Sequence, residues 1–324
     1  MKVNFFVEDM LFFKYIGCAT LARMLAGKLA ENADLDLAWN AHGYDYDVVH
    51  YHTFGPLALA NKKYSRGVKV LTAHSTPRLN NGNLAFSDTV NRLYPGIYRG
   101  FDHIITISGP NDQEVREMAP DVPVTLIPNG VNRDRFRPEP EKRAAFRREH
   151  GIGDEEMVVL TVAQQTPRKG IYDFIALSKE HPDIKFVWVG GFPYGSFSKD
   201  YRRIEEEKKG CGKNVIFTGF VRDITAAYCS ADLFFMPSFA EGLPMVILES
   251  MATGVPVLAR RIPEFVENFE GAALFFDDLE EAGAVVEDET VIRRHAALSR
   301  PFTDRFDIGR VADLHVNLYK ELIP

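Results

Sequence analysis

Two glutamates separated by seven residues are the side chains in this sequence best suited to hold hydroxyl-rich molecules. Glu241 lies in a loop after the apolar run DLFFMP, and Glu249 lies about two turns along the segment of helical pattern that follows. A carboxylate accepts two hydrogen bonds from neighbouring hydroxyls, so this spacing can offer one acid to a sugar ring and the other to a ribose. The alternative is a solvated loop glutamate beside an exposed helix glutamate.

The loop between these acids is itself suited to anions. Pro244 stands near the first predicted helical position, and Gly254 closes the helix. The backbone N–H groups of Gly242 and Leu243 therefore lie at a helix start, where a partial positive charge of about half a unit favours an anion or a developing leaving group.

The pattern of apolar residues predicts the frame that positions these loops, and it occurs twice. Short β-branched or aromatic runs alternate with longer segments of helical period, which indicates parallel sheets built from βαβ units. The predicted strands are 2–7, 35–39, 47–50, 69–72, 103–107 and 124–127, then 157–162, 185–189, 214–217, 232–236 and 255–258. The predicted helices of the second half are 171–180, 199–209, 223–229, 244–252 and 304–322.

A charged segment from Val131 to Glu156 interrupts this pattern with two prolines and two glycines, which predicts a linker near Gly151. We therefore expect an α/β protein with two Rossmann-like parallel-sheet domains, residues 1–150 and 151–300, and a cleft between them. The remaining segment, 301–324, is expected to return as a helix to the first domain.

Composition narrows the function classes. The net charge is −7, with 15 basic and 15 acidic residues up to Pro140 and 23 and 30 beyond it, so nonspecific nucleic-acid binding is disfavoured. Three scattered cysteines predict a reducing compartment with no disulfide framework or zinc site. The sequence shows no signal-peptide pattern and no apolar run of about 18 residues, so we expect a cytoplasmic protein that contacts a membrane from one side if at all.

The string SFAEGLPMVILESMATGVPVLA, from Ser238 to Ala259, resembles the donor-binding motif of family 4 retaining glycosyltransferases, which have the two-domain GT-B architecture. Three further segments resemble this family in the same order: 127–138 the pre-linker motif, 162–191 the diphosphate-binding loop with its helix and strand, and 217–221 the base-binding turn. The strings RKGIYDF, FVWVGG, DYDVVHYHTFGP and AHST are most similar to those of enzymes that add sugars to glycolipids such as diacylglycerol.

This resemblance assigns roles within the second domain. Lys169 and Arg168 follow a predicted strand at its carboxyl end and would neutralise a leaving diphosphate without a metal, although an exposed basic turn is the alternative. Many relatives carry an arginine five residues before the lysine, where this chain has Gln164. The resemblance implies that Glu249 binds the ribose, that Glu241 with the amides of Gly242 and Leu243 binds the hexose, and that Phe220 and Gly191 border the base.

The first domain supplies two further candidates. Gly17 lies between the first strand and the first helix, where its backbone can approach a phosphate or sugar, and it resembles the family's glycine loop, although relatives often have two adjacent glycines. His74, just past a strand, stands where family members use a histidine against the donor sugar. His50 and His52 have no third ligand nearby for zinc, so a core or cleft-lining role is expected for them.

The expected reaction is transfer of a hexose, with UDP-glucose as donor, to a membrane lipid. For a retaining enzyme the resemblance implies that the acceptor attacks from the face that the diphosphate leaves, that the leaving phosphate takes the proton, and that neither a protein nucleophile nor a metal or other cofactor is needed. The strings KKYSR (62–66) and RLYPGIYR (92–99) mix basic and aromatic residues, as in contacts with the inner face of the cell membrane, or as on solvated helix faces.

Two alternatives remain open from the sequence. One is an enzyme of the same fold that builds a polysaccharide or a polyprenyl-linked glycan. The other is a nucleotide-sugar-binding protein that has lost turnover, although Arg168, Lys169, Glu241 and Glu249 are all present. A sugar phosphorylase is disfavoured, because no lysine stands in a context that would anchor pyridoxal phosphate.

Overall fold

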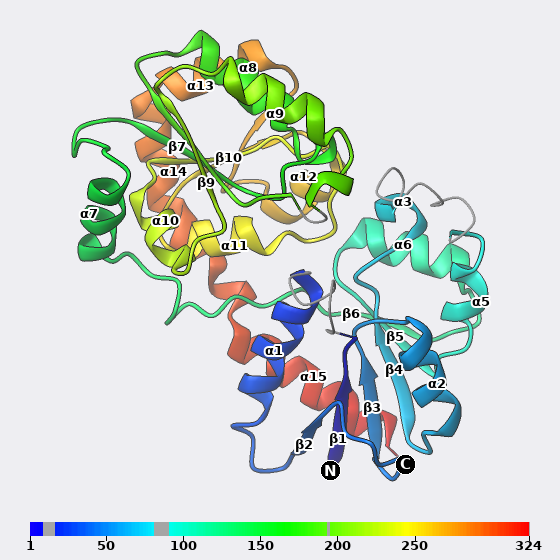
Figure 1. Ribbon diagram of the computed structural model, residues 1–324. Helices are drawn as coiled ribbons and strands as arrows, with labels where there is room; N and C mark the ends of the chain where they lie inside the picture. Colours follow the sequence, from blue (N-terminus) through cyan, green and yellow to red (C-terminus); the bar gives the residue numbers. More distant parts are fainter. Residues whose placement is uncertain (9–16, 81–90, 193–194, 324) are drawn as a thin grey trace. The chain divides into compact units, whose positions relative to one another are not determined.

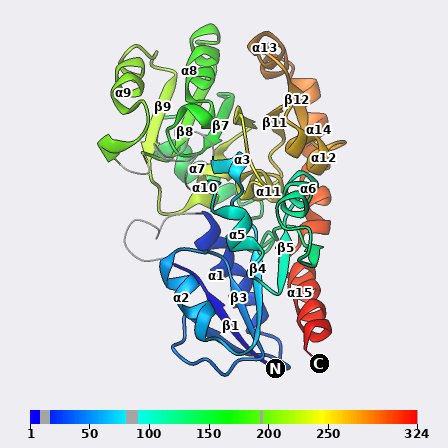
Figure 2. The same ribbon diagram turned by 90° about the vertical axis from the view of Figure 1, so that its right-hand side faces the viewer.

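The computed structural model describes residues 1–8, 17–80, 91–192 and 195–323. The chain forms two compact units, shown in Figures 1 and 2. The first unit contains Met1–Gly130 together with Phe306–Pro324, and the second contains Val131–Arg305. The chain thus leaves the first unit once and returns to it.

The first unit is built on a parallel sheet of six strands in the order β2-β1-β3-β4-β5-β6. The strands are β1 (Lys2–Phe6), β2 (Asp36–Trp39), β3 (Val48–Tyr51), β4 (Val68–Thr72), β5 (His103–Thr106) and β6 (Val124–Leu126). The chain moves to one side of β1 to make β2 and to the other side to make β3, and crevices that bind ligands form at the carboxyl ends of strands beside such a reversal.

Helices cover both faces of this sheet. They are α1 (Gly17–Leu29), α2 (Pro56–Tyr64), α3 (Pro77–Asn80), α5 (Tyr94–Tyr98), α6 (Gly109–Met118) and α15 (Ile308–Leu322). One core cluster joins α1 and α15 to the sheet through Leu25, Leu29, Val311 and Tyr319, whereas a second cluster joins α2, α5 and α6 to it. Figure 1 shows α15, drawn in red, among the elements of this unit although it follows the second unit in sequence.

The second unit has a parallel sheet in the order β12-β11-β10-β7-β8-β9. Its strands are β7 (Val158–Val162), β8 (Lys185–Val189), β9 (Val215–Gly219), β10 (Leu233–Met236), β11 (Val257–Arg260) and β12 (Leu274–Phe276). Its helices are α7 (Pro140–Glu149), α8 (Ile171–Glu180), α9 (Tyr201–Lys209), α10 (Ile224–Ser230), α11 (Met245–Ala252), α12 (Pro263–Phe269), α13 (Leu279–Glu287) and α14 (Glu289–Phe302). The strand order reverses between β7 and β10, and open sheets of this kind bind ligands at the carboxyl ends of the strands beside such a reversal.

The prediction of two Rossmann-like parallel-sheet domains is confirmed, and each predicted strand is present within about two residues of its expected bounds. Strand β12 and helices α3, α5, α6, α7, α12, α13 and α14 were not predicted. The segment from 304 begins as a single turn, η4 (Thr303–Phe306), and becomes α15 only after Asp307, whose side chain accepts a hydrogen bond from the Gly309 amide.

The division between the units falls after Gly130 and not at the predicted linker near Gly151. The charged segment that indicated a linker forms α7, which packs on α10. Arg147 is 1% exposed and donates hydrogen bonds to the carbonyls of Ser230, Gly153 and Asp154 and to Asp232. Because a guanidinium has five donors in a fixed fork, this set of acceptors allows a charged residue to be buried.

Membrane-spanning helices and metal sites were two subjects of the sequence analysis. In the part of the chain that the structure describes, no helix is both long enough and apolar enough to cross a bilayer. The described residues also contain no group of three or more histidine, cysteine, aspartate or glutamate side chains placed to hold a metal ion.

Candidate active site

The candidate residues of the second unit follow the carboxyl ends of four neighbouring strands. Arg168 and Lys169 come after β7, Gly191 after β8 and Phe220 after β9, while the loop after β10 carries Glu241, Gly242 and Leu243 and continues into α11 with Glu249. Parallel strands end at one edge of a sheet, so residues separated in sequence by up to 81 positions share this edge. The edge includes the reversal between β7 and β10.

The loop after β7 is shaped by a short 3₁₀ turn, η2 (Pro167–Lys169), and by Gly170. Gly170 has φ of +75°, and a Cβ there would lie 2.4 Å from the Pro237 carbonyl oxygen, so the close approach of the loop after β10 requires glycine. The Phe239 amide donates to the Arg168 carbonyl at 2.9 Å, and the Arg168 guanidinium donates to the Ala240 carbonyl at 2.6 Å. The two loops are therefore held together by backbone and side-chain hydrogen bonds.

Lys169, Arg168 and Glu241 form a charged cluster at this junction. The Lys169 ammonium donates a short hydrogen bond to Glu241 Oε1, and the Arg168 guanidinium lies 3.5 Å from the same oxygen. The side chains are largely buried, at 14% exposure for Lys169 and 9% for Glu241. One carboxylate thus faces two cations, which leaves a local excess of positive charge.

Burial and charge compete in setting the pKa values of this cluster. Burial alone would raise the pKa of Glu241, but the charges of Lys169 and Arg168 and hydrogen bonds from Lys169 and Ser238 hold it below its usual value. Burial lowers the pKa of Lys169 from its ordinary 10.5, and the Glu241 charge opposes this change. Glu241 is therefore ionised at neutral pH and pairs with the ammonium beside it.

Glu249 has a different environment. It lies on α11, the helix that follows the loop of Glu241, and its Oε2 accepts a hydrogen bond of 2.7 Å from Tyr228 Oη. Burial raises the pKa of Glu249, partly offset by the Tyr228 hydrogen bond and the Arg135 charge. Because one carboxylate oxygen is used by Tyr228, the other is the acceptor available to a hydroxyl group.

Pro244 is the N-cap of α11, which begins at Met245, one position later than the first predicted helical residue. Leu243 is buried at 4% exposure and Gly242 is half-buried. The amides of both residues therefore precede the helix and lie close in sequence to the carboxylate of Glu241.

Gly191 and Phe220 lie in contact at the ends of β8 and β9. A Cβ on Gly191 would come within 3.0 Å of the Phe220 ring, which is 71% exposed. Gln165, which the sequence analysis did not single out, is buried beside them: its amide N–H donates to Gly191 O at 3.0 Å and its side chain to Gly190 O at 2.9 Å.

Arg260 is a second residue at this sheet edge that the sequence analysis did not single out. Arg260 ends β11, pairs with Asp173 and donates to the Pro237 carbonyl at 3.2 Å, and its guanidinium lies 4.1 Å from the centroid of the exposed Phe239 ring. Its position at the carboxyl end of a predicted strand is the signal that applied to Lys169 and would have identified it.

In the first unit, Gly17 is the first residue of α1, and Tyr15 and Ile16 lie outside the described residues. His74 follows β4, and its Nε2 lies 3.0 Å from Nδ1 of His52, which follows β3. His50 shares hydrogen bonds of 2.6 Å with Tyr319 Oη and Thr72 Oγ1, which is the expected core role. Tyr319 lies on α15, so the last helix reaches the histidine cluster.

Burial controls the charge of these imidazoles. It lowers the pKa of His74 to about 4 and that of His315, on α15, to about 4. It lowers the pKa values of His50 and His52 well below 6.5, helped by the charges of the neighbouring imidazoles. The whole cluster is therefore neutral near pH 7.

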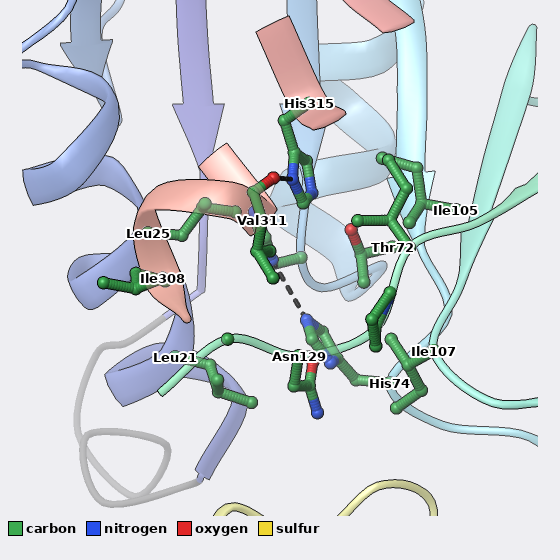
Figure 3. Close-up of a pocket in the computed structure, with 14 residues that line it drawn as sticks. Leu21, Leu25, Thr72, His74, Ile105, Ile107, Asn129, Ile308, Val311 and His315 are labelled. Carbon is green, nitrogen blue, oxygen red and sulfur yellow. Dashed lines mark hydrogen bonds between the residues drawn. The ribbon is translucent and has the colours of Figure 1, made fainter. Parts of the chain in front are cut away.

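A pocket opens beside this cluster, at the carboxyl ends of β4 and β5 and against α1 and α15 (Figure 3). It is lined by Leu21, Leu25, His52, Thr72, His74, Ile105, Ile107, Ile127, Pro128, Asn129, Gly130, Ile308, Val311 and His315. One of the candidate residues, His74, therefore lines a pocket at the sheet edge of the first unit.

Comparison with known proteins identifies the family. Residues 142–289 match the family described as Glycosyl transferases group 1, and residues 22–135 match Glycosyltransferase Family 4. The processive diacylglycerol alpha-glucosyltransferase of Acholeplasma laidlawii is 30% identical over 232 residues, which cover 68% of this chain and 68% of that protein. The chain belongs to the family 4 glycosyltransferases.

Another relative of this glycosyltransferase is the alpha-galactosylglucosyldiacylglycerol synthase of Streptococcus pneumoniae, 32% identical over 235 residues. The match covers 69% of this chain and 63% of that protein, so less than two thirds of the relative's length is spanned. An O-antigen biosynthesis glycosyltransferase of Escherichia coli, WclY, is 28% identical over 236 residues, covering 71% of this chain and 64% of that protein.

Solved structures agree on the fold. Anabaena HepE, solved in complex with UDP-glucose, aligns with a TM-score of 0.83 at 19% identity, covering 99% of this chain and 100% of HepE. Sucrose-phosphate synthase from Thermosynechococcus elongatus aligns with a TM-score of 0.84 at 19% identity, covering 99% of each chain. The glycosyltransferase therefore has the GT-B fold.

Proposed function

We propose that this glycosyltransferase is a retaining, metal-independent enzyme that transfers a hexose from a nucleotide sugar, UDP-glucose, to a membrane lipid of the diacylglycerol class. The observation that carries the proposal is the cluster of Lys169, Arg168 and Glu241 at the reversal between β7 and β10. The UDP-glucose complex of HepE supports the donor class, and the two relatives named for diacylglycerol products or substrates support the acceptor class.

The cluster is arranged for an exchange of partners. Without a donor, Glu241 balances one of the two cations, and the positive excess favours a diphosphate. A bound diphosphate gives Lys169 and Arg168 new acceptors, so the Glu241 carboxylate becomes free to accept from hydroxyls of the hexose. The amides of Gly242 and Leu243 add donors beside it.

The remaining candidates complete the donor site. Glu249, oriented by Tyr228, accepts from the ribose hydroxyls through the oxygen that Tyr228 does not use. Phe220, with its exposed ring against Gly191, borders the base. From the first unit, His74 acts on the transferred sugar and Gly17 on the sugar or phosphate, as the family resemblance implies.

In the chemical step the bond between the sugar and the diphosphate breaks, and the acceptor oxygen forms its bond on the same face. The leaving phosphate takes the acceptor's proton, while Lys169 and Arg168 stabilise the charge that develops on it. The role of the protein is then orientation and electrostatic stabilisation, without a nucleophile of its own and without a metal.

The surface of the first unit supports the proposal of a lipid acceptor. Leu57 and Tyr64 lie seven positions apart on α2, and so on one side of it, at 52% and 60% exposure. Lys62 and Lys63 lie in the last turn of this helix, and Leu93 before α5 is 59% exposed. Exposed apolar side chains beside lysines are typical of contact with an anionic membrane face, so we propose peripheral association with the inner face of the cell membrane.

The test is release of nucleoside diphosphate from UDP-, GDP- and ADP-sugars in the presence of EDTA, measured with diacylglycerol vesicles, with a polyprenyl-linked glycan and without an acceptor. Release from UDP-glucose that requires lipid and ignores EDTA is expected. Release that requires a polyprenyl-linked glycan instead would favour the second candidate, glycan synthesis, for which the O-antigen relative argues. Tight donor binding without release under any acceptor would show a binding protein and contradict the proposal.

A further inference from the structure

Apart from the contact proposed between His74 and the transferred sugar, the pocket of the first unit has no assigned ligand, and its lining has a clear chemical character. Seven aliphatic side chains form most of the wall: Leu21, Leu25, Ile105, Ile107, Ile127, Ile308 and Val311. Asn129, Thr72 and three histidines supply the polar groups, and none of the described side chains that line it is charged at neutral pH. Figure 3 shows Leu21 and Ile308 on one side of the pocket and Ile107 with His74 on the other.

The imidazoles add hydrogen-bonding capacity without charge. His74 and His315 have pKa values lowered to about 4 by burial, so they stay neutral at physiological pH. His315 Nδ1 lies 2.8 Å from the Val311 carbonyl, one turn earlier on α15, and is thereby the protonated nitrogen that donates. An anion such as a diphosphate therefore meets no cation among the described residues that line this pocket.

His52, which lines the pocket, has one polar atom without a partner among the described residues. His52 is 4% exposed, and its Nδ1 is engaged with His74, but its Nε2 is buried without a hydrogen bond. Leaving a buried polar atom unsatisfied typically costs about 1–3 kcal/mol, so most such atoms in proteins are paired. A ligand that brings one oxygen to His52 would remove this cost.

The lining of the pocket indicates which class of ligand it suits. A free hexose carries more hydroxyls than five polar side chains, four of them already bonded to neighbours, can satisfy, and a charged headgroup has no counter-charge among the described residues here. An aliphatic wall with a few neutral polar groups matches an uncharged amphiphile that has a hydroxyl or ester oxygen next to a hydrocarbon chain.

We propose that this pocket binds the glycerol-ester end of an uncharged lipid acceptor, with an ester or hydroxyl oxygen at His52 and the first methylenes of an acyl chain against α1 and α15. This inference rests on the lipid acceptor of the proposed function. It assigns His52 and Leu21 to acceptor binding, apart from the donor residues of the second unit.

The test uses 1,2-dioctanoylglycerol as the probe and the full chain labelled with ¹⁵N-histidine. Nitrogen resonances of the imidazoles are recorded during titration, and the dissociation constant is measured alongside. We expect the Nε2 resonance of His52 to shift. The Leu21→Trp variant, which places an indole in the pocket, should weaken binding at least about tenfold, equivalent to about 1.4 kcal/mol.

Leu314→Trp is the matched control, because Leu314 lies on α15 at 46% exposure and does not line the pocket. Binding of UDP, measured by calorimetry, should be the same in both variants and shows that each is folded. If Leu21→Trp fails to fold, Leu21→Phe takes its place, and the resonances of the unmodified protein still decide the question.

Three results would overturn the inference. Binding of dioctanoylglycerol with unchanged histidine resonances would place the lipid elsewhere on the protein. A shift produced by free glucose and not by the lipid would make the pocket a sugar site. No lipid binding, in an enzyme that releases UDP in the presence of diacylglycerol vesicles, would refute the pocket while the proposed function stands, whereas absence of that release refutes the function itself.

Discussion

The two units of this glycosyltransferase have similar sheets, but the carboxyl edge of one sheet carries charged side chains and that of the other carries uncharged ones. In the second unit, the charged groups of Lys169 and Arg168 both lie within 3.5 Å of Glu241 Oε1. In the first unit, four histidines occupy the corresponding edge and burial keeps them neutral. The fold thus provides the edge, and the loop residues decide whether it suits a charged or an uncharged ligand.

Removing the ammonium group of Lys169 should have the largest effect on turnover. We expect Lys169→Ala to fold normally and to lose about 10²–10³ in kcat, because the leaving diphosphate loses its most buried charge partner. Steady-state release of nucleoside diphosphate measures this. Lys179→Ala is the control, since Lys179 is half-exposed and pairs with Glu207 on a helix surface. Equal activity of both variants would remove Lys169 from the diphosphate site.

Neutralising the carboxylate should separate nucleotide binding from sugar transfer. In Glu241→Gln the acceptor that competes for Lys169 loses its charge, so we expect UDP to bind at least as tightly as before while kcat falls about 10- to 100-fold. Calorimetry with UDP and turnover with UDP-glucose give the two values. A parallel loss of both would show that Glu241 supports the structure of the loop and has no separate role toward the hexose.

The histidine cluster predicts a pH dependence confined to the first unit. His74 and His315 take up protons in the unfolded chain as pH falls below 6.5 but resist them in the folded chain down to about 4, so their contribution to stability is present above 6.5 and is lost as pH falls toward 4. Each adds a slope of up to about 1.36 kcal/mol per pH unit.

Urea unfolding between pH 7 and pH 4.5 tests this dependence. We expect His315→Gln, which keeps a side chain able to donate to the Val311 carbonyl, to be less sensitive to pH than the parent protein by about one proton. An identical slope in the two proteins would mean that His315 is protonated in the folded state, and the first unit would then not be uncharged at its sheet edge.

The smallest effect is expected for a change beside Glu249, the carboxylate proposed to bind the ribose. Tyr228→Phe removes the hydrogen bond to Glu249 Oε2, which costs about 1 kcal/mol and raises the pKa of Glu249 further. Binding of UDP should weaken by a few-fold and decline more at acidic pH than in the parent protein, as measured by calorimetry at pH 7 and pH 5.5. Unaltered affinity at both pH values would argue against contact between Glu249 and the nucleotide.

Much of the fold could be predicted because parallel strands covered on both faces are nearly continuous apolar runs. The segments VVLTV and KFVWV, for instance, correspond to β7 and β8. Helix α7 was missed because its charged residues resemble a linker, and its arginines become interpretable only when the carbonyl and carboxylate oxygens around α10 are located. Sequence pattern gives the period of an element but not the partners of its polar side chains.

The candidate site shows the same limit. Positions after strands could be predicted, since strand ends place Lys169 and Glu241 at one edge. The pairing of these two residues, the contact of His52 with His74 and the pocket itself depend on side-chain geometry between distant segments. His50 and Tyr319, which share a hydrogen bond, are separated by 269 positions, and no local pattern connects them.

The late position of α15 in the chain has a consequence for biosynthesis. The apolar face that it covers, including Leu25 and Leu29, is made early, whereas α15 is made only after residues 131–305. At about 5–20 residues per second, a ribosome needs roughly 10–35 s for that stretch. When this interval ends, the second unit has its complete sequence and can fold before α15 has been made, while one side of the earlier-made sheet is still uncovered.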